Sequence, residues 1–246
     1  MRISDRLLKI KERKLLWGLL FIAIPIPSLS MESLINKNTV WSAEMSPILI
    51  DRDITVLENA TLTISAGVII KFSNYSQLLV KGCLIAKGEK QRPIRFTSAQ
   101  EKPQVNDWKG LVFYGKRSSG LLSFCHISYS HKNICWGATP KIENCQFSQN
   151  KYALYCANNA APRLMNNLFV QNTYGIYSDY SSPYIKENTI MNNYYGIYLL
   201  FSSSPLIGEN RVEKNEEKDI YFDNSLGENN SGTVSNYVWG LIKDIF

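Results

Sequence analysis

The chain has 246 residues, of which 45% are hydrophobic and 20% charged, and this composition excludes a mostly disordered polymer. Five cysteines are too few for a small scaffold held together by disulfides. The formal net charge of +6 favours an anionic partner such as nucleic acid only if that charge lies on the folded part of the chain.

Residues 1–30 hold most of this charge and are typical of a secretory signal. Six basic and two acidic side chains give the segment a net charge of +4. The apolar run Leu15–Ile26 follows, and Ser28 and Ser30 frame a small-x-small cleavage site. The run is short against the ~20 residues of a membrane helix, so we expect cleavage after Ser30 and a periplasmic or extracellular location. The alternative is an uncleaved signal anchor, with membrane contact through this segment alone.

The next part of the chain consists of short apolar runs separated by turn residues such as Gly and Asn. The expected strands are Ile54–Val56, Thr61–Ile64, Val68–Phe72, Leu78–Val80, Leu84–Ala86, Ile94–Phe96 and Leu111–Phe113. Residues 31–49 are expected to form an N-terminal cap over the first coil, because an uncovered strand edge would pair with other chains.

A repeat with prolines spaced 22, 21 and 22 residues apart occupies the C-terminal half of the chain. Its units are Pro140–Phe147, Pro162–Phe169, Pro183–Ile190 and Pro205–Val212. The first three units are followed by Tyr152–Tyr155, Tyr174–Tyr177 and Tyr195–Tyr198, and the last by a degenerate Lys218–Tyr221. Because the apolar positions alternate and show no helical period, each repeat predicts one coil of short strands, stacked ~4.8 Å from the next.

Equivalent positions of successive repeats are expected to form inward columns of like residues. These columns are Ile142/Leu164/Ile185/Ile207, Phe147/Phe169/Ile190/Val212 and Leu154/Ile176/Ile197. Residues 50–223 have room for about eight coils at this spacing. Residues 224–246 end in an apolar run and are expected to cap the last coil, with a partner-binding tail as the alternative.

Several segments resemble a known family. Ala60–Phe72, Lys81–Gly88, Pro93–Ser98 and Asp107–Leu111 are similar to segments of exported right-handed parallel β-helix proteins. The rhythm of Asn followed by Tyr-Gly-Ile-Tyr resembles the repeat shared by pectate-lyase-like proteins and a periplasmic copper-binding group. The resemblance implies an all-β, right-handed parallel β-helix over residues 50–223. It implies no single activity, because this scaffold carries lyases, hydrolases, epimerases, adhesins and non-catalytic modules.

The tyrosines offer the best candidate for a binding surface. Strand alternation predicts an outward ladder beside a lane of small residues. The ladder is Tyr155, Tyr177 and Tyr198, and the lane is Ala153, Gly175 and Gly196. A flat aromatic strip can receive sugar rings, with the phenol groups as hydrogen-bond partners. Alternatively, the stacked rings only stabilise neighbouring strands. The other column, Tyr152, Tyr174 and Tyr195, is expected to point elsewhere or lie at corners.

Two asparagine columns are expected to be structural, because Asn tolerates turn geometry and can bond to the next Asn along a stack. They consist of Asn167, Asn188 and Asn210, and of Asn150, Asn172, Asn193 and Asn215.

Glu187 and Glu209 are weak candidates for catalytic carboxylates. They occupy equivalent positions on adjacent coils, so their backbones are expected ~5 Å apart. Retaining glycosidases use a similar carboxylate separation. Both residues lie at a turn, however, where Lys186 and Arg211 are near enough to neutralise them.

The cysteines admit three interpretations. Cys125 and Cys145 are expected in one column on adjacent coils, where a disulfide can form, and Cys135 and Cys156 in adjoining columns. Unpaired packing in the core is the second interpretation. The third is a soft-metal site, for which Cys125, His126 and Cys145 are weak candidates without a tight ligand motif.

The leading hypothesis is an exported, non-catalytic module that binds polysaccharide or another cell-envelope component along the Tyr/Gly face. The alternatives are a carbohydrate-active enzyme, either a polysaccharide lyase or a glycoside hydrolase, and a periplasmic metal-handling protein. No cofactor is expected, since neither calcium nor copper has a tight ligand motif. Nucleic acid is not expected as a partner, because the repeats carry no Lys/Arg stripe.

Overall fold

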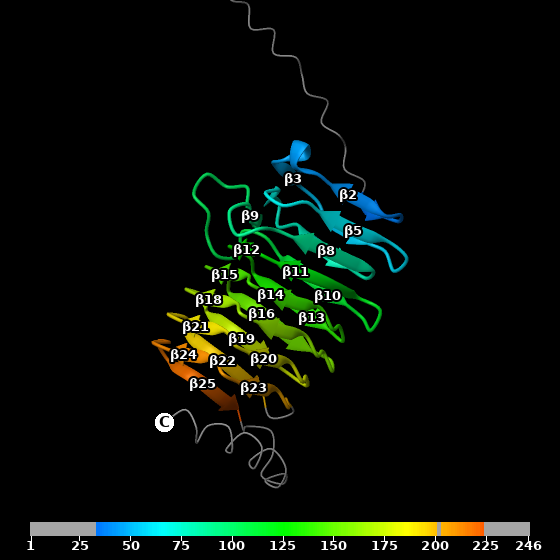
Figure 1. The fold of residues 1–246 in the computed structure, drawn as a ribbon. Coiled ribbons are helices and arrows are strands. Elements are labelled where there is room, and N and C mark those ends of the chain that lie inside the picture. Colours follow the sequence, from blue (N-terminus) through cyan, green and yellow to red (C-terminus); the bar gives the residue numbers. More distant parts are fainter. Residues whose placement is uncertain (1–32, 201–202, 224–246) are drawn as a thin grey trace, which may run out of the picture. The chain divides into compact units, whose positions relative to one another are not determined.

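The computed structural model describes residues 33–200 and 203–223, which form a parallel β-solenoid (Figure 1). The predicted signal segment 1–30 and the predicted cap 224–246 lie outside these residues. Within the described part there are twenty-five β-strands and one short 3-10 helix, Ala43–Met45. In the described residues, no helix is both long enough and apolar enough to cross a membrane.

The strands form three parallel sheets that run the length of the solenoid. The first sheet has nine strands, β1 (Leu34–Ile35), β4 (Ile54–Val56), β7 (Gln77–Val80), β10 (Gly110–Tyr114), β13 (Lys132–Trp136), β16 (Tyr152–Ala157), β19 (Tyr174–Ser178), β22 (Tyr195–Leu200) and β25 (Lys218–Asp223). The second has eight, β2 (Thr39–Trp41), β5 (Thr61–Ile64), β8 (Cys83–Lys87), β11 (Ser119–Ser123), β14 (Lys141–Glu143), β17 (Arg163–Met165), β20 (Tyr184–Lys186) and β23 (Leu206–Gly208). The third also has eight, β3 (Ile48–Ile50), β6 (Ile69–Phe72), β9 (Ile94–Ser98), β12 (Cys125–Ser128), β15 (Gln146–Ser148), β18 (Leu168–Val170), β21 (Thr189–Met191) and β24 (Arg211–Glu213).

One strand from each sheet makes a coil, so the described residues form eight complete coils and the first strand of a ninth. The expected parallel β-helix is confirmed, but its start is earlier than predicted. Within the expected cap 31–49, the strands β1, β2 and β3 pair in parallel with the strands of the next coil, so residues 34–49 belong to the first coil. The segment supplies its own inward residues, Ile35, Trp41 and Ile48, all of which are buried.

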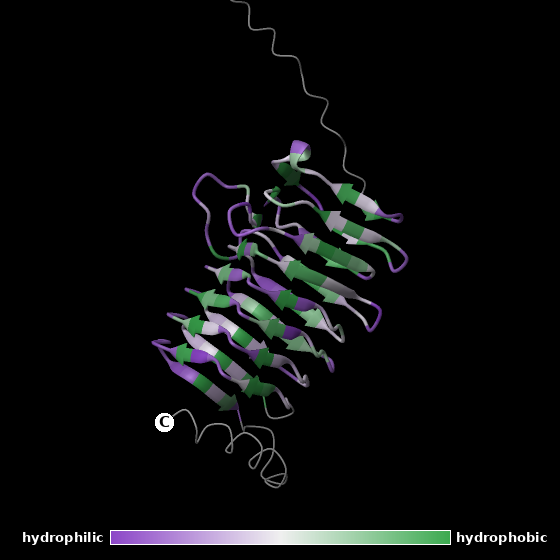
Figure 2. Cartoon of the chain, viewed as in Figure 1, coloured by the Kyte–Doolittle hydropathy of each residue, from purple (hydrophilic) through white to green (hydrophobic). Residues whose placement is uncertain are grey.

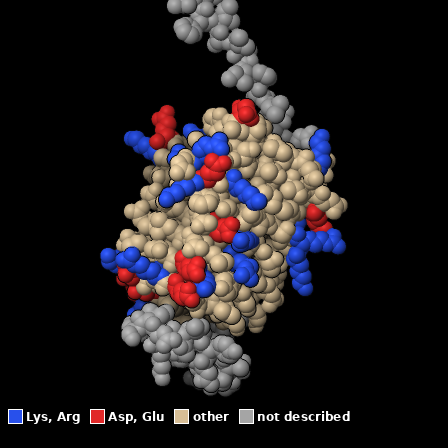
Figure 3. Space-filling model, in the orientation of Figure 1, with Lys and Arg blue, Asp and Glu red and all other residues tan. Residues whose placement is uncertain are grey.

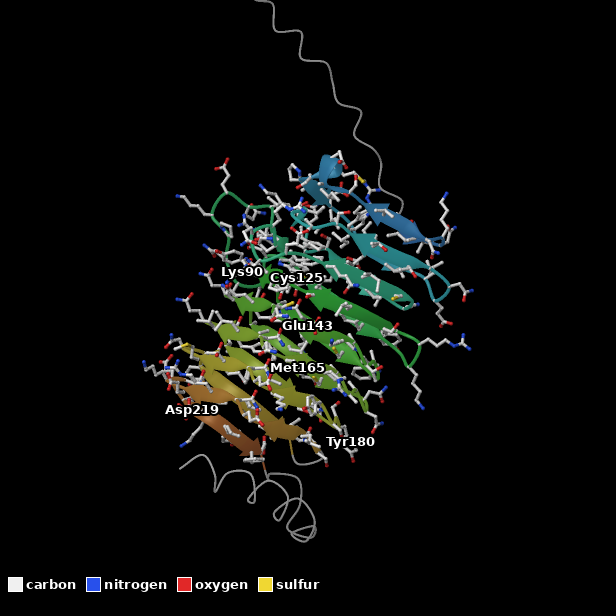
Figure 4. All side chains as sticks on the ribbon, in the orientation of Figure 1. Lys90, Cys125, Glu143, Met165, Tyr180 and Asp219 are labelled. Atoms are coloured by element: carbon white, nitrogen blue, oxygen red, sulfur yellow. The ribbon has the colours of Figure 1, made fainter. Side chains whose placement is uncertain are left out.

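The core is a stack of like residues, as the repeat predicts. The three predicted inward columns are buried, except that Val212 of the last complete coil is only half-buried. Figure 2 shows the strands striped by hydrophobic residues and the turns dominated by hydrophilic ones. Figure 4 shows the column principle on the outside, where Glu143 and Met165 follow one another on successive coils of the second sheet.

Two tight corners set the coil shape. The first corner joins the second sheet to the third, and the second corner joins the third sheet to the first. Each turns on a residue with φ between 54° and 58° in successive coils of the repeat region. These residues are Asn144, Asn166, Glu187 and Glu209 at the first corner, and Gln149, Gln171, Asn192 and Lys214 at the second. Asn is tolerated in this left-handed region, whereas Glu, Gln and Lys adopt it because the coil geometry demands the turn.

Each corner contains the predicted asparagine column as a buried hydrogen-bonded ladder. Asn172 shows the pattern: its backbone N–H and its Nδ2 both donate to Asn193 Oδ1, at 3.0 and 2.9 Å, and Nδ2 also donates to the Phe147 carbonyl at 3.0 Å. Asn167, Asn188 and Asn210 repeat this pattern at the first corner. The ladders satisfy backbone groups that a turn buries, so the structural role expected for them is confirmed.

One connection at the second corner is much longer than the others. Residues 99–109 form a loop between β9 and β10, drawn in green beside β9 and β12 in Figure 1. Trp108 anchors the loop, because its ring stacks on Phe72 with centroids 4.0 Å apart and its Nε1 donates to the Ser128 carbonyl at 2.8 Å. Asn106 Oδ1 lies 3.0 Å from Nδ1 of His131 on the following corner. The loop is therefore fixed against the solenoid at both of these points.

Charged side chains lie mainly at the turns and outer strand positions. On the face seen in Figure 3, acidic and basic side chains stand next to one another. Examples of their pairing are Lys109 with Asp53 at 2.8 Å and Arg117 with Glu58 at 2.6 Å. Such exposed pairs each contribute little, on the order of 0–1 kcal/mol.

Candidate functional site

The outer face of the first sheet carries two neighbouring tyrosine columns. Register places Tyr155, Tyr177, Tyr198 and Tyr221 in one column, and Tyr152, Tyr174 and Tyr195 in the other. Rings within a column stack on one another, with centroids 4.7–5.3 Å apart among the six tyrosines of β16, β19 and β22. Rings of the two columns meet edge to face at 5.2–5.8 Å on each coil. We call these seven residues the tyrosine face.

The second tyrosine column was expected to point elsewhere or to lie at corners. Its residues are the first of their strands, directly after the second corner, and their rings contact the first column on the same outer face. Strict alternation would put residues three apart on opposite faces of the strand. Each of these strands instead has two consecutive buried residues between its two tyrosines, as in Tyr174-Gly175-Ile176-Tyr177. The small residue lies at the end of the strand next to the asparagine ladder, so both tyrosines face outward.

The lane of small residues is likewise not on the surface. Ala153, Gly175 and Gly196 are all buried. A Cβ on Gly175 would lie 2.5 Å from the Gly196 carbonyl oxygen and 3.4 Å from Asn193 Nδ2. These positions are small because backbone and ladder leave no room for a side chain, and they form no groove for a ligand.

The ladder exposes ring edges and not ring faces. Adjacent rings within a column are parallel to within 18° on β16, β19 and β22, so each ring covers the face of the next. At the start of the ladder, Lys132 Nζ lies 4.6 Å from the Tyr152 ring centroid and 4.3 Å from that of Tyr155. The tyrosine face therefore exposes phenol edges and hydroxyl groups to solvent. At its N-terminal end, the Lys132 ammonium lies over the ring faces of Tyr152 and Tyr155.

Two carboxylates accept hydrogen bonds from the ladder. The Tyr155 hydroxyl donates to Asp179 Oδ2 at 3.3 Å, and the Tyr198 hydroxyl donates to Asp223 Oδ2 at 3.2 Å. Burial, reinforced by Asp179, raises the pKa of Tyr155 to about 12. Burial also raises the pKa of Tyr177 and Tyr198 well above 10. The hydroxyls thus remain neutral donors at physiological pH. The sequence analysis did not single out Asp179, Asp223 or Lys132. Their positions relative to the tyrosine motifs, either one coil before a motif or two residues after its last tyrosine, could have indicated them.

A further aromatic pair lies upstream on the same sheet. Tyr114 and Trp136 stack with their ring centroids 6.4 Å apart, and they are 49% and 40% exposed. They are register partners on β10 and β13, two residues after the outward-facing Val112 and Ile134. This pair extends the aromatic surface of the first sheet towards the N-terminal coils.

Glu187 and Glu209 occupy equivalent corner positions on adjacent coils, as expected. Lys186 Nζ lies 3.3 Å from Glu187 Oε1 and 3.3 Å from Glu209 Oε2. Both carboxylates raise the pKa of Lys186, chiefly through their hydrogen bonds. Arg211 pairs instead with Glu213 at 2.6 Å. An ammonium shared between two exposed carboxylates is an ion-pair arrangement of a surface corner.

The cysteines all lie unpaired, and four of the five are buried. The Cys125 backbone N–H donates to Cys145 Sγ at 3.4 Å, while burial raises the pKa of the Cys125 thiol. Cys135 and Cys156, expected in adjoining columns, are direct register partners. A disulfide in either pair stays a prediction.

The candidate metal ligands do not converge. Cys125 points into the core, whereas His126, the next residue of β12, lies on the outer side of the strand. Across residues 33–200 and 203–223, no group of three or more His, Cys, Asp or Glu side chains is arranged to hold a metal ion.

Comparison with known families agrees with the architecture. A family model described as a right-handed β-helix region matches residues 29–185 and 134–238. The chain belongs to the right-handed β-helix family. No curated protein and no solved structure shows significant similarity to this β-helix. Its function must therefore be argued from its own side chains.

Proposed function

We propose that this β-helix is an exported, non-catalytic module that binds polysaccharide along the tyrosine face. The observation that supports the proposal is the array of phenol hydroxyls flanked by Asp179 and Asp223. The array repeats once per coil, at ~4.8 Å, which is close to the length of one sugar unit in an extended glycan. A linear chain lying along the solenoid can thus meet an equivalent set of groups on each successive coil.

The mode of binding differs from the flat stacking expected from the motifs alone. Stacking covers the faces of neighbouring rings, so the glycan contacts ring edges and hydroxyl groups. The hydroxyls of Tyr155 and Tyr198 donate to Asp179 and Asp223, so their oxygens can accept from sugar hydroxyls. The Tyr177 hydroxyl can donate to a sugar oxygen, and the two carboxylates can accept from sugar hydroxyls. Rigid stacking keeps these groups in place before binding, which lowers the entropy lost on association.

The test removes ladder hydroxyls without changing the stack. Tyr177→Phe with Tyr198→Phe keeps both rings but deletes two hydroxyls. We expect affinity for the preferred member of a panel of soluble neutral and acidic polysaccharides to fall by about tenfold or more, since each hydrogen bond contributes about 1 kcal/mol. Isothermal titration calorimetry measures this.

Tyr184→Phe is the matched control, because Tyr184 lies on the second sheet with the Arg163 guanidinium 4.8 Å from its ring centroid. Unchanged affinity of the ladder variant, or an equal loss in the Tyr184 variant, would remove the tyrosine face from the function. Release of new reducing ends or unsaturated products from any polysaccharide would show that the module is catalytic.

Export is the second part of the proposal, and the basic-apolar-small order of residues 1–30 supports it. N-terminal sequencing of the protein recovered from outside the cytoplasm tests this part. We expect the sequence to start after Ser30, and recovery of the chain only from the cytoplasm with Met1 intact would contradict export.

A further inference from the structure

A shallow groove lies beside the tyrosine face, at the second corner of the last coils. Its volume is about 410 Å³. Gln171, Asn192 and Lys214, the left-handed corner residues of three successive coils, line it together with Thr173 and Tyr194. Equivalent positions on stacked coils thus place a row of long polar side chains along one edge of the solenoid.

The floor of the groove is rigid. It contains Asn172 and Asn193, whose side-chain amides are occupied by the buried ladder. Val105, from the anchored loop 99–109, also lines the groove and is 40% exposed. The groove is therefore built on the most regular part of the fold, with an apolar contact from the long loop.

The polar side chains above this floor are available to a ligand. Within the part of the chain that the structure describes, the side chains of Gln171, Thr173, Asn192 and Tyr194 make no hydrogen bond to another residue. Two amides and two hydroxyls together offer both donors and acceptors. They line one groove, so a single ligand can engage several of them.

Tyr194 differs from the tyrosines of the ladder. Its ring is perpendicular to that of Tyr195, at 90° with centroids 5.0 Å apart, and it is 41% exposed. Tyr194 stands outside the parallel stacks, and among the residues that the structure describes no ring of the next coil covers it. It also joins the groove to the tyrosine face through its contact with Tyr195.

The chemistry of the lining selects the ligand class. Lys214 and Glu216 carry opposite charges, so the groove has no net preference for an anion such as phosphate. Val105 is the aliphatic residue of the lining, which is too little for a lipid chain. Amides, hydroxyls and one aromatic ring are instead the set that pairs with the hydroxyls and C–H surface of an uncharged sugar.

We propose that this groove is a second binding subsite, which takes a short neutral oligosaccharide or a neutral branch of the glycan held on the tyrosine face. The inference rests on the proposed function and deepens it by naming the ligand class and the place of the additional contact. The tyrosine face then binds the extended glycan chain, and the corner groove binds a sugar unit that branches from that chain.

The experiment uses short probes, which can reach at most three of the four coils of the tyrosine face. Neutral and uronic-acid trisaccharides are titrated into the full chain and two variants, with heteronuclear NMR and calorimetry as readouts. The groove variant combines Gln171→Gly and Tyr194→Ala, because Gly accepts the left-handed backbone at position 171 without strain. The ladder variant carries Tyr177→Phe and Tyr198→Phe. Circular dichroism confirms that both variants keep the wild-type fold.

We expect a neutral trisaccharide to bind, and the groove variant to lose about tenfold or more of that affinity, as two lost polar or aromatic contacts imply. The ladder variant keeps trisaccharide binding but loses binding of the long polysaccharide. Trisaccharide binding that is absent, unaffected in the groove variant, or stronger for the uronic acid would overturn the subsite while the long-chain result still judges the tyrosine face. If neither short nor long glycans bind, both proposals fail.

Discussion

The asparagines show how one residue type serves the whole stack. Each ladder amide bonds to a neighbouring coil and to a strand carbonyl, so a corner that would bury unpaired backbone groups is satisfied from coil to coil. The second-corner ladder ends differently. Asp219, seen on the last strand in Figure 4, accepts from the Asn215 backbone N–H at 3.1 Å and from Asn215 Nδ2 at 2.7 Å. Within the described residues, a carboxylate thus accepts the hydrogen bonds that the next asparagine accepts on the earlier coils.

The tyrosines of the ladder predict a distinct alkaline titration. A phenol that is buried in the folded state resists ionisation, so its folded pKa lies above its unfolded value of 10.0. For Tyr155, with a folded pKa of about 12, the associated stability is fully present below pH 10 and is lost as the pH rises towards 12. We expect tyrosinate absorbance to show a late phase in this range, accompanied by loss of the β-sheet circular dichroism signal.

The Tyr155→Phe variant provides the control for that assignment. It should lose amplitude from the late phase and show a smaller fall in stability between pH 10 and 12. Titration of all tyrosines together near pH 10, with the fold intact, would contradict the half-buried state of the stacked tyrosines.

The strands of the first sheet divide their outer face into two regions. Its central outward column is Leu34, Thr55, Leu79, Val112, Ile134, Tyr155, Tyr177, Tyr198 and Tyr221. The column is aliphatic, apart from one threonine, over the first five strands and aromatic over the last four. The phenol hydroxyls of this column are thus confined to the C-terminal coils, the same coils that carry the corner groove.

The buried glycines of these strands provide a test of the arrangement in which both tyrosines of a strand face outward and the glycine between them faces inward. A Cβ at Gly175 would lie 2.5 Å from the Gly196 carbonyl oxygen, whereas a Cβ at Gly208 on β23 would have no heavy atom within 4 Å. We expect Gly175→Ala to lower the free energy of unfolding by about 1–3 kcal/mol, because backbone must shift to admit the methyl group. Gly208→Ala, the matched control, should change it by about 0.5 kcal/mol or less. Chemical denaturation of both variants measures this, and equal effects would contradict the buried position of Gly175.

At the scale of the whole molecule, each inner coil packs between two neighbouring coils, whereas a terminal coil of the described residues packs against one. β25 is the last strand of the first sheet in the described residues, and its inward residues Ile220 and Phe222 are only half-buried. A parallel strand edge favours association with another chain wherever it is left without cover. The predicted role of residues 224–246 as a cap follows from this need.

Truncation tests the predicted cap. A chain ending at Asp223 is expected to self-associate or aggregate at lower temperature than the full chain, because it would leave the half-buried residues of the last coil and the β25 edge uncovered. A chain ending at residue 236, which removes only the apolar run from Tyr237 to Phe246, separates the role of that run from the rest of the tail. Light scattering during a thermal ramp measures this. Monomeric behaviour of both truncated chains, with unchanged melting, would favour the alternative of a partner-binding tail.

The repeat of 21–22 residues was sufficient to predict the parallel coils, the inward columns and the asparagine ladders. The repeat predicts these features because each coil buries the same positions against the next coil. The same local residue pattern therefore recurs several times along the chain. The tertiary structure alone decided that residues 34–50 form a coil, that both tyrosine columns share one face and that Gly175 is buried. The last two outcomes depend on how a strand leaves its corner, where two consecutive residues turn inward and break the two-residue alternation. The tyrosine motif by itself does not reveal this break in alternation. A small residue between the two tyrosines is expected both beside an exposed groove and at a crowded, buried corner.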